Sequence, residues 1–256
     1  MKDNMKSSIL NEEFGAEDVA EKIRDLDELK NTFIALVSHE LRTPLNLMVG
    51  YLDLSIQELE NDPVATKKYL TIVEKNTHKL VQVVQELTDF TRLQLGKEIT
   101  YLDLIPIEDA FLQTYDLLKP NLIKKNINLV ADFQEEVLTL RYDSESLIIL
   151  FRNLLSNAAK FSPEDSKVLV VGKIKKDQLV ITINDWANPI SDDKRETIFE
   201  DFRQLENYLT RRYEGMGLGL AVARRTARFM GGTIQLAVRD DGNTFKILLP
   251  LKTKED

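Results

Sequence analysis

Two long stretches of helical periodicity fill most of the first hundred residues, and they restrict the possible folds more than any other feature. The apolar residues of the first stretch, which begins near residue 16, recur at steps of three and four: Val19, Ile23, Leu26, Phe33 and Val37. Such a narrow stripe is typical of a coiled-coil seam. A single amphipathic helix packed on a core has similar spacing, but the narrowness of the stripe favours a dimer seam.

The second stretch is separated from the first by a clear stop. The first helix should continue past Pro44, with a kink where the proline removes a backbone hydrogen bond. Asp62 suits the cap of the next helix and Pro63 its first position. The second helix should run to about residue 95, with an inward stripe of Tyr69, Ile72, Val73, Asn76, Leu80, Val83, Leu87 and Phe90. One such αα-hairpin cannot cover both apolar stripes, so we expect a homodimer that forms an antiparallel four-helix bundle.

From about residue 97 the pattern changes to short strands mixed with helices. We expect strands in EITYLDL, INLVADF, VLTLRY, KVLVVGKI, DQLVITIND, GTIQLAV and TFKILLPL. We expect helices at 106–118 and 143–159, from near Asp192, and from near Leu218 to before Gly231. This mixture predicts an α/β sandwich with helices over one sheet face. The predicted organisation is a flexible segment at 1–15, a helical hairpin at 16–96 and an α/β domain at 97–254.

Composition excludes several kinds of site and partner. The net charge of −8 argues against nucleic-acid binding, which usually needs a basic face. Because there is no cysteine, disulfides, thiolate nucleophiles and zinc–cysteine sites are excluded. A metal ion would need oxygen ligands, since there are only two histidines. No apolar run approaches the roughly 20 residues that span a bilayer, so we expect a cytoplasmic chain. If an N-terminal sensor region precedes it in the full protein, that region would be its only contact with a membrane.

His39 lies in the middle of the first predicted helix, within SHELRTPL. A neutral imidazole is a good nucleophile when one nitrogen is free and the other is protonated and held. Glu40 could hold and then accept that proton, although adjacent helical residues do not face each other squarely. Thr43 shares a helix face with His39, and its hydroxyl could orient a water molecule. A lone helical histidine is more often structural or solvated than catalytic, and we interpret His78 as a surface or bundle-edge residue.

A second polar group lies on a predicted helix within LFRNLLSNAAKF. Asn153 and Asn157 are four residues apart and share a face, and their carbonyl oxygens suit Mg²⁺. Lys160 is one turn beyond Asn157, where it could meet a phosphate. By spacing alone, two asparagines hydrogen-bonded inside a core explain the pattern equally well.

Gly215, Gly217 and Gly219 open a later predicted helix within GMGLGL. Glycines let the backbone approach phosphates, and a helix N-terminus favours anions. This pattern alone is a weak signal and usually marks only a turn. The string IFEDFR precedes these glycines and resembles a box of the histidine kinase family. That resemblance implies a mobile lid at residues 204–214, and Arg203 could reach a phosphate.

Together these strings resemble the sequence boxes of sensor histidine kinases, in family order and over about residues 16–254. SHELRTPL resembles the H-box, LFRNLLSNAAKF the N-box, IFEDFR the F-box and GMGLGL the second glycine box. The resemblance implies a dimerising hairpin followed by a Bergerat-type ATP-binding domain. It also implies that His39 receives the γ-phosphoryl group of ATP, that Glu40 is the base and that Thr43 assists dephosphorylation of the partner.

The same resemblance implies the ligands and the partner. Mg²⁺ would lie at Asn157, and the partner would be the receiver domain of a response regulator. ATP would be held by the residues that match the nucleotide boxes: Asn153, Asn157, Lys160, Phe161, Asp185, Ile190, Arg203, Gly215, Gly217, Leu218, Gly219 and Leu220.

One box departs from the family pattern of D-x-G-x-G-I at the end of a strand. Asp185 matches the acid that hydrogen-bonds the adenine amino group, and Ile190 also matches. Ala187 and Pro189 replace both glycines, so this loop must take another shape. We expect reduced nucleotide affinity or a reshaped adenine pocket. Trp186 is interpreted as a packing residue beside the loop rather than one that stacks on the base.

The sequence therefore predicts a kinase that autophosphorylates on His39 and passes the phosphoryl group to an aspartate of a response regulator. One alternative is a kinase-impaired phosphatase or scaffold of the same fold, with weak nucleotide binding. Another is a coiled-coil interaction protein with a non-catalytic domain, which the four boxes in family order disfavour.

Overall fold

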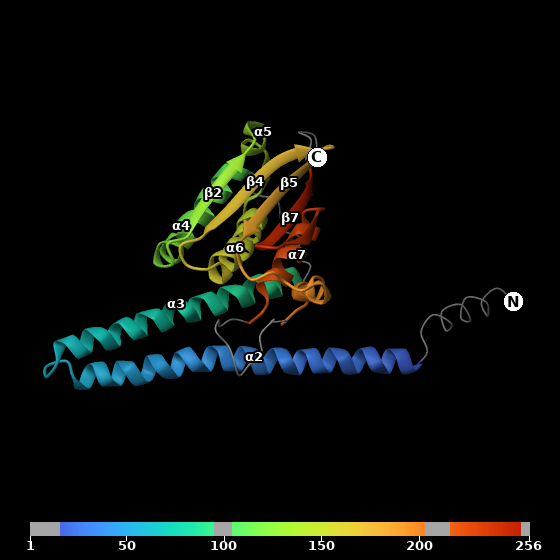
Figure 1. Cartoon of the computed structure of the whole chain (residues 1–256). Helices are drawn as coiled ribbons and strands as arrows, with labels where there is room; N and C mark the ends of the chain where they lie inside the picture. Colours follow the sequence, from blue (N-terminus) through green and yellow to red (C-terminus); the bar gives the residue numbers. More distant parts are fainter. Residues whose placement is uncertain (1–15, 95–103, 203–215, 252–256) are drawn as a thin grey trace. The chain divides into compact units, whose positions relative to one another are not determined.

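The computed structural model describes residues 16–94, 104–202 and 216–251 (Figure 1), so the predicted segment 1–15 and the predicted lid lie outside the described residues. The chain divides into two compact units, Met1–Val83 and Val84–Asp256. None of the described helices is both long enough and apolar enough to cross a membrane.

The first unit is an antiparallel helical hairpin made by α2 (Ala16–Gln57) and the first part of α3 (Pro63–Gln94). α2 continues through Pro44 as predicted. The rings of Tyr51 and Tyr69 lie 5.7 Å apart between centroids, and Thr77 Oγ1 donates to Met48 Sδ at 3.7 Å. These contacts pair the two helices side by side.

The turn of the hairpin forms as the sequence predicts. Oδ1 of Asp62 accepts hydrogen bonds from the backbone N–H groups of Val64 at 3.0 Å and Ala65 at 2.9 Å. Pro63 is the first residue of α3, where its missing N–H costs nothing. The cap and the proline thus explain why the second helix starts where it does.

The second unit contains a five-stranded sheet in the order β2-β4-β5-β7-β6. β2 and β4 are parallel, and the other neighbouring pairs are antiparallel. β1 and β3 form a separate antiparallel pair. The elements are β1 (Leu104–Pro106), α4 (Ile107–Lys124), β2 (Asn128–Phe133), α5 (Glu135–Leu138), β3 (Arg141–Asp143), α6 (Ser144–Phe161), β4 (Lys167–Lys175), β5 (Gln178–Asp185), η1 (Asp192–Lys194), η2 (Thr197–Phe199), α7 (Gly219–Phe229), β6 (Thr233–Arg239) and β7 (Gly242–Pro250).

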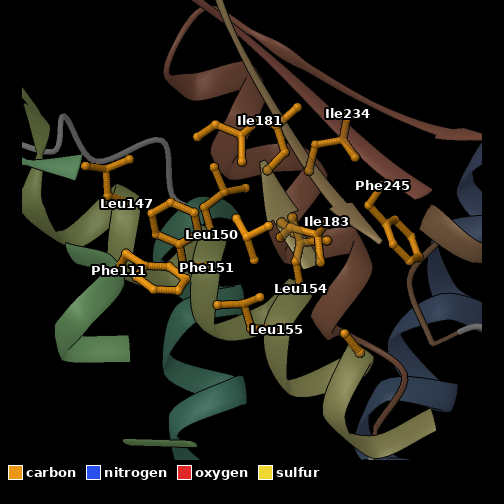
Figure 2. Close-up of a cluster of buried hydrophobic side chains, with 14 of the residues drawn as sticks. Phe111, Leu147, Leu150, Phe151, Leu154, Leu155, Ile181, Ile183, Ile234 and Phe245 are labelled. Atoms are coloured by element: carbon orange, nitrogen blue, oxygen red, sulfur yellow. The ribbon is translucent and has the colours of Figure 1, made fainter. Parts of the chain in front are cut away.

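The core of this unit lies between the sheet and the helices α4, α6 and α7 (Figure 1). α6 supplies Leu150 and Leu154, which are fully buried and meet Ile181 and Ile183 of β5 (Figure 2). Alternation along β5 turns these two isoleucines to the helix-covered face. The same alternation places Asp185, at the end of the strand, on that face.

Most predicted elements of the second unit are confirmed, but the strand predicted in VLTLRY is wrong in its first half. Residues there form the short helix α5, and only β3 is extended. Val137 is fully buried, and its backbone N–H donates to Gln134 O at 2.9 Å. Packing of Val137 into the core therefore overrides the β propensity of this string.

Two other differences concern boundaries. The helix predicted near Asp192 consists of the 3₁₀ turns η1 and η2, and α4 is longer than predicted. In the string EITYLDL, only Leu104 lies within the described residues, at the start of β1. Asp143 caps α6, because its Oδ2 accepts a hydrogen bond from Ser146 N at 2.8 Å.

Candidate functional site

His39 is presented on the surface of α2 beside a buried carboxylate. Its side chain is 60% exposed, whereas that of Glu40 is only 3% exposed. Nδ1 of His39 lies 3.7 Å from Oε1 of Glu40, so the glutamate side chain does reach back toward the preceding residue. The nucleophile candidate is thus open to a ligand, and the base candidate is held in place.

Thr43 lies one turn beyond His39 and is exposed. Its Oγ1 donates a hydrogen bond to the backbone oxygen of His39 at 3.1 Å. This bond uses the hydroxyl proton and leaves the oxygen lone pairs as acceptors, which fixes how Thr43 could orient a water molecule. The second histidine, His78, is exposed on α3, as predicted.

The N-box and the second glycine box meet where α6 passes the start of α7. Asn153 is buried, and its Nδ2 donates to Ile149 O at 2.8 Å. A Cβ atom added to Gly219 would lie 3.0 Å from Asn153 Oδ1 and 3.7 Å from Asn157 Nδ2. The glycine therefore allows α7 to begin directly against the two asparagines. The sequence alone related these two motifs only through their order in the family.

The turn before α7 explains the other residues of that box. Gly217 has a φ of 73°, a left-handed conformation that favours glycine. Met216 and Leu218 on either side of it are fully buried and anchor the turn, and Leu220 packs against the core. The predicted ligands Arg203 and Gly215 lie outside the described residues.

Lys160 and Phe161 lie at the C-terminal end of α6, where the chain leaves the core. Lys160 Nζ lies 5.2 Å from the centroid of the Phe161 ring, and Phe161 is 46% exposed.

The end of α6 is held by Lys125, which the sequence analysis missed. Its Nζ donates to the backbone oxygens of Ala159, Lys160 and Ser162 at 3.1, 2.7 and 2.7 Å. These carbonyls have no partner within the helix, so a lysine there satisfies them. Desolvation by burial lowers the pKa of Lys125, against an opposing effect of Glu164.

Asp185 lies at the C-terminal end of β5 with 3% exposure. Its Oδ1 accepts hydrogen bonds from Ala187 N at 3.0 Å, Asn243 N at 3.2 Å and Asn243 Nδ2 at 3.1 Å. Desolvation by burial raises the pKa of Asp185, while these bonds and the charge of Arg239 oppose the rise. All three bonds end on Oδ1, which leaves Oδ2 as the oxygen suited to a ligand donor.

The loop after Asp185 is fixed by Asn243, a second residue that the sequence analysis missed. Oδ1 of Asn243 accepts from Ile190 N at 3.0 Å, and its Nδ2 also donates to Asn188 O at 3.2 Å. Ile190 itself packs against the core. The altered glycine box therefore has a defined shape, which is built around a residue far along the chain.

Trp186 is a packing residue, as predicted. Its ring lies 4.8 Å from Lys167 Nζ and 5.0 Å from the guanidinium carbon of Arg239. Both cations contact the indole through its π system. The string IFEDFR, which resembles the F-box, also contributes to the packed interior, because Ile198 and Phe199 of η2 are buried.

The described residues contain no group of three or more His, Asp or Glu side chains that could hold a metal ion. The oxygens available beside Gly219 are those of the asparagine side chains. Mg²⁺ keeps water and phosphate ligands and needs few protein ligands. The asparagine side chains present at this place are compatible with an ion that is bound together with a nucleotide.

Two family models match the chain in order. Residues 29–96 match the His Kinase A (phospho-acceptor) domain, and residues 142–253 match the histidine kinase-, DNA gyrase B-, and HSP90-like ATPase family. Hybrid signal transduction histidine kinase D of Dictyostelium discoideum is 33% identical over 242 residues, which cover 92% of this chain and 16% of that protein. The next curated relatives are likewise matched over only 43% and 26% of their length.

Solved structures agree with the fold. Full-length ShkA in complex with AMPPNP is 28% identical, with a TM-score of 0.62 over 86% of this chain and 45% of that one. Histidine kinase ThkA in complex with the response regulator protein TrrA has a TM-score of 0.63 at 20% identity, over 96% of this chain and 70% of that one. With the phospho-acceptor and ATPase-type domains both matched and in family order, the chain belongs to the sensor histidine kinases.

Proposed function

We propose that this protein transfers the γ-phosphoryl group of ATP to His39 and then to an aspartate of a response regulator. The observation that carries the proposal is the exposed imidazole of His39 beside the buried carboxylate of Glu40, 3.7 Å from Nδ1. A nucleophile must be open to its substrate, and its base must be fixed close by.

The approach of Glu40 to Nδ1 supports a separate role for each nitrogen of His39. Glu40 faces Nδ1, so Nε2 is the nitrogen that attacks the γ-phosphorus. The Nε2–P bond forms, the bond from phosphorus to the bridging oxygen of ADP breaks, and Glu40 accepts the Nδ1 proton. The phosphoryl group then moves to a carboxylate oxygen of the receiver aspartate as the Nε2–P bond breaks, and Glu40 returns the proton to Nδ1 so that the imidazole leaves neutral.

The second unit supplies the nucleotide site. Oδ2 of Asp185 accepts from the adenine amino group, and the start of α7 at Leu218–Leu220 faces the phosphates through its N–H groups. Lys160 and Arg203 neutralise phosphate charge, and Phe161 lies beside the ligand. A bound Mg²⁺ ion, with Asn157 as ligand, would offset charge on the phosphate oxygens. The structure of ShkA in complex with AMPPNP, an ATP analogue, supports this assignment.

The functional form is a homodimer made through the hairpin, with residues 16–96 as the dimerisation unit and 97–254 as the ATP-binding domain. In a single copy many apolar side chains of the hairpin are exposed: Ile34, Leu45, Leu47, Val49, Leu52, Leu54, Ile56, Leu59, Val64, Leu70 and Val81. Such a large exposed apolar surface is typical of a protein–protein interface. A second hairpin would cover it in a four-helix bundle.

The partner is the receiver domain of a response regulator, in the cytoplasm. The complex of ThkA with the response regulator TrrA supports this class of partner. Thr43, one turn from His39, would orient the water that hydrolyses the phosphorylated regulator.

The test is phosphorylation of the full chain with γ-labelled ATP and Mg²⁺, beside His39→Gln and the control His78→Gln. We expect acid-labile, alkali-stable label on the wild type and on His78→Gln, and no label on His39→Gln. The label should then chase onto a receiver domain. Label that persists on His39→Gln, or ATP binding without any label, would refute the proposal.

A further inference from the structure

The loop from Asp185 to Ile190 keeps a defined shape although it lacks both glycines of its family pattern. We infer that Asn243 is the positioning residue that replaces them: it holds the carboxylate of Asp185 for the adenine base and fixes the loop that follows. This inference rests on the proposed function of Asp185 in nucleotide recognition. Asn243 itself does not touch the nucleotide in this role.

The sheet register brings the two residues together. Asp185 is the cross-strand partner of Asn243 in the antiparallel pair β5–β7. Both side chains are on the helix-covered face, with exposures of 3% and 1%. The neighbouring Gly242 permits this close pairing, because a Cβ atom there would lie 2.0 Å from the backbone oxygen of Asp185.

The side-chain amide of Asn243 ties three points of the loop at once. Nδ2 donates to Asp185 Oδ1 at 3.1 Å and to Asn188 O at 3.2 Å, and Oδ1 accepts from Ile190 N at 3.0 Å. An amide has both donors and an acceptor, whereas a carboxylate has no donor. No other side chain of this length offers the same combination, which explains why an asparagine suits this place.

Arg239 fixes the same loop from the other side of the strand pair. Its Nη2 donates to the backbone oxygen of Asp185 at 2.8 Å, and its Nη1 donates to the backbone oxygen of Asn243 at 3.1 Å. The guanidinium also covers the ring of Trp186. The backbone of Asp185 is therefore held independently of Asn243, so loss of the asparagine amide should release mainly the carboxylate and the loop.

The consequence concerns base recognition. Two bonds from Asn243 and one from Ala187 hold Oδ1 and so fix the rotation of the carboxyl group. The position of Oδ2 is then fixed as well, because both oxygens belong to the same planar carboxylate. Loss of the Asn243 side chain removes one of the three bonds to Oδ1 and both ties to the loop at Asn188 and Ile190. The carboxylate and the loop can then turn away from the adenine amino group, while the phosphate contacts at Gly219 and Asn157 remain.

The experiment measures the affinity of the full chain for ATP and for inosine triphosphate, in which a carbonyl replaces the amino group. We expect Asn243→Ala to weaken ATP binding about 10- to 100-fold and inosine triphosphate binding less than about 3-fold. Asn243→Asp keeps the acceptor for Ile190 but loses both donors and places a second carboxylate beside Asp185, so it should weaken ATP binding at least as much. Asn188→Ala is the control, since it removes an exposed side chain but keeps the backbone oxygen that Asn243 uses.

A double-mutant cycle with Asp185→Asn separates positioning from general stability. We expect Asn243→Ala to change ATP affinity less than about 2-fold when Asp185 is already replaced. An equal loss in both backgrounds, or an equal loss for both nucleotides, would overturn the inference. If Asn243→Ala unfolds, the same comparisons with Asn243→Asp decide. A wild type that binds neither nucleotide would instead refute the proposed function.

Discussion

Nδ1 of His39 lies 3.7 Å from Oε1 of Glu40, although the two residues are adjacent in α2. Successive residues of an α-helix point about 100° apart, so the approach depends on the glutamate side chain folding back along the helix. Glu40 is buried and His39 is exposed, which is consistent with the proposed roles of a fixed base and an accessible nucleophile.

Glu40→Gln should therefore remove most of the kinase activity and little else. Glutamine keeps the size of the side chain but does not accept a proton, so the rate of His39 phosphorylation should fall about 10²- to 10⁴-fold. ATP affinity should stay unchanged, because Glu40 belongs to the other unit. The rate is measured as acid-labile label per minute, with the exposed Glu60→Gln as control. An unchanged rate would rule out Glu40 as the base.

Asp185→Asn should stabilise the protein while it weakens ATP binding. Burial raises the pKa of Asp185, so its charged form is less favourable in the folded state than in the unfolded state. The contribution of this group to stability is therefore lost as pH rises through the folded pKa. Asparagine avoids the buried charge, so at neutral pH and without nucleotide the melting temperature should rise by about 2–4 °C. The gain should shrink as pH falls toward the unfolded pKa of about 3.9. Equal melting temperatures from acid to neutral pH would contradict this.

Arg152→Ala should destabilise the second unit through Asp89. Asp89 is buried and forms an ion pair with Arg152, and Gln85 Nε2 donates to its Oδ1 at 2.9 Å. Loss of the arginine leaves a buried carboxylate without its countercharge, at a cost of about 1–3 kcal/mol in the free energy of unfolding. The measurement is urea unfolding of the full chain.

The pair of Arg92 with Glu145 offers a matched control for that variant. It also joins α3 to α6, but its side chains are 44% and 41% exposed. Water screens such a pair, so Arg92→Ala should cost less than about 1 kcal/mol. If Arg152→Ala and Arg92→Ala lower the free energy of unfolding equally, burial of Asp89 does not explain the contribution of the Arg152–Asp89 pair.

Gly219→Ala should weaken ATP binding because its methyl group would press on Asn153. The added Cβ would lie 3.0 Å from Asn153 Oδ1, so the asparagine must shift by a few tenths of an ångström. We expect ATP affinity to fall about 10-fold, measured by titration. Gly50→Ala is the control, since nothing lies within 4 Å of its added Cβ, and it should stabilise α2 by about 0.5–1 kcal/mol. Unchanged ATP affinity in Gly219→Ala would argue against close contact of this turn with the nucleotide.

Local features of the sequence determined the elements and the order of the candidate sites. The spacing of apolar residues predicted α2 and α3, and Asp62 with Pro63 predicted the turn between them. These features are readable because capping and periodicity act over one or two helical turns. The same is true of Asn153 and Asn157, which are placed on one face by helix geometry alone.

The tertiary structure decided which distant residues complete each site. Asn243 reaches Asp185 only because β7 pairs with β5, and Lys125 caps α6 only because α4 packs beside it. Even VLTLRY was split into a helix and a strand by the burial of Val137. Such contacts join residues tens of positions apart, and their energies depend on the register and packing of the whole domain, which no local pattern in a single sequence contains.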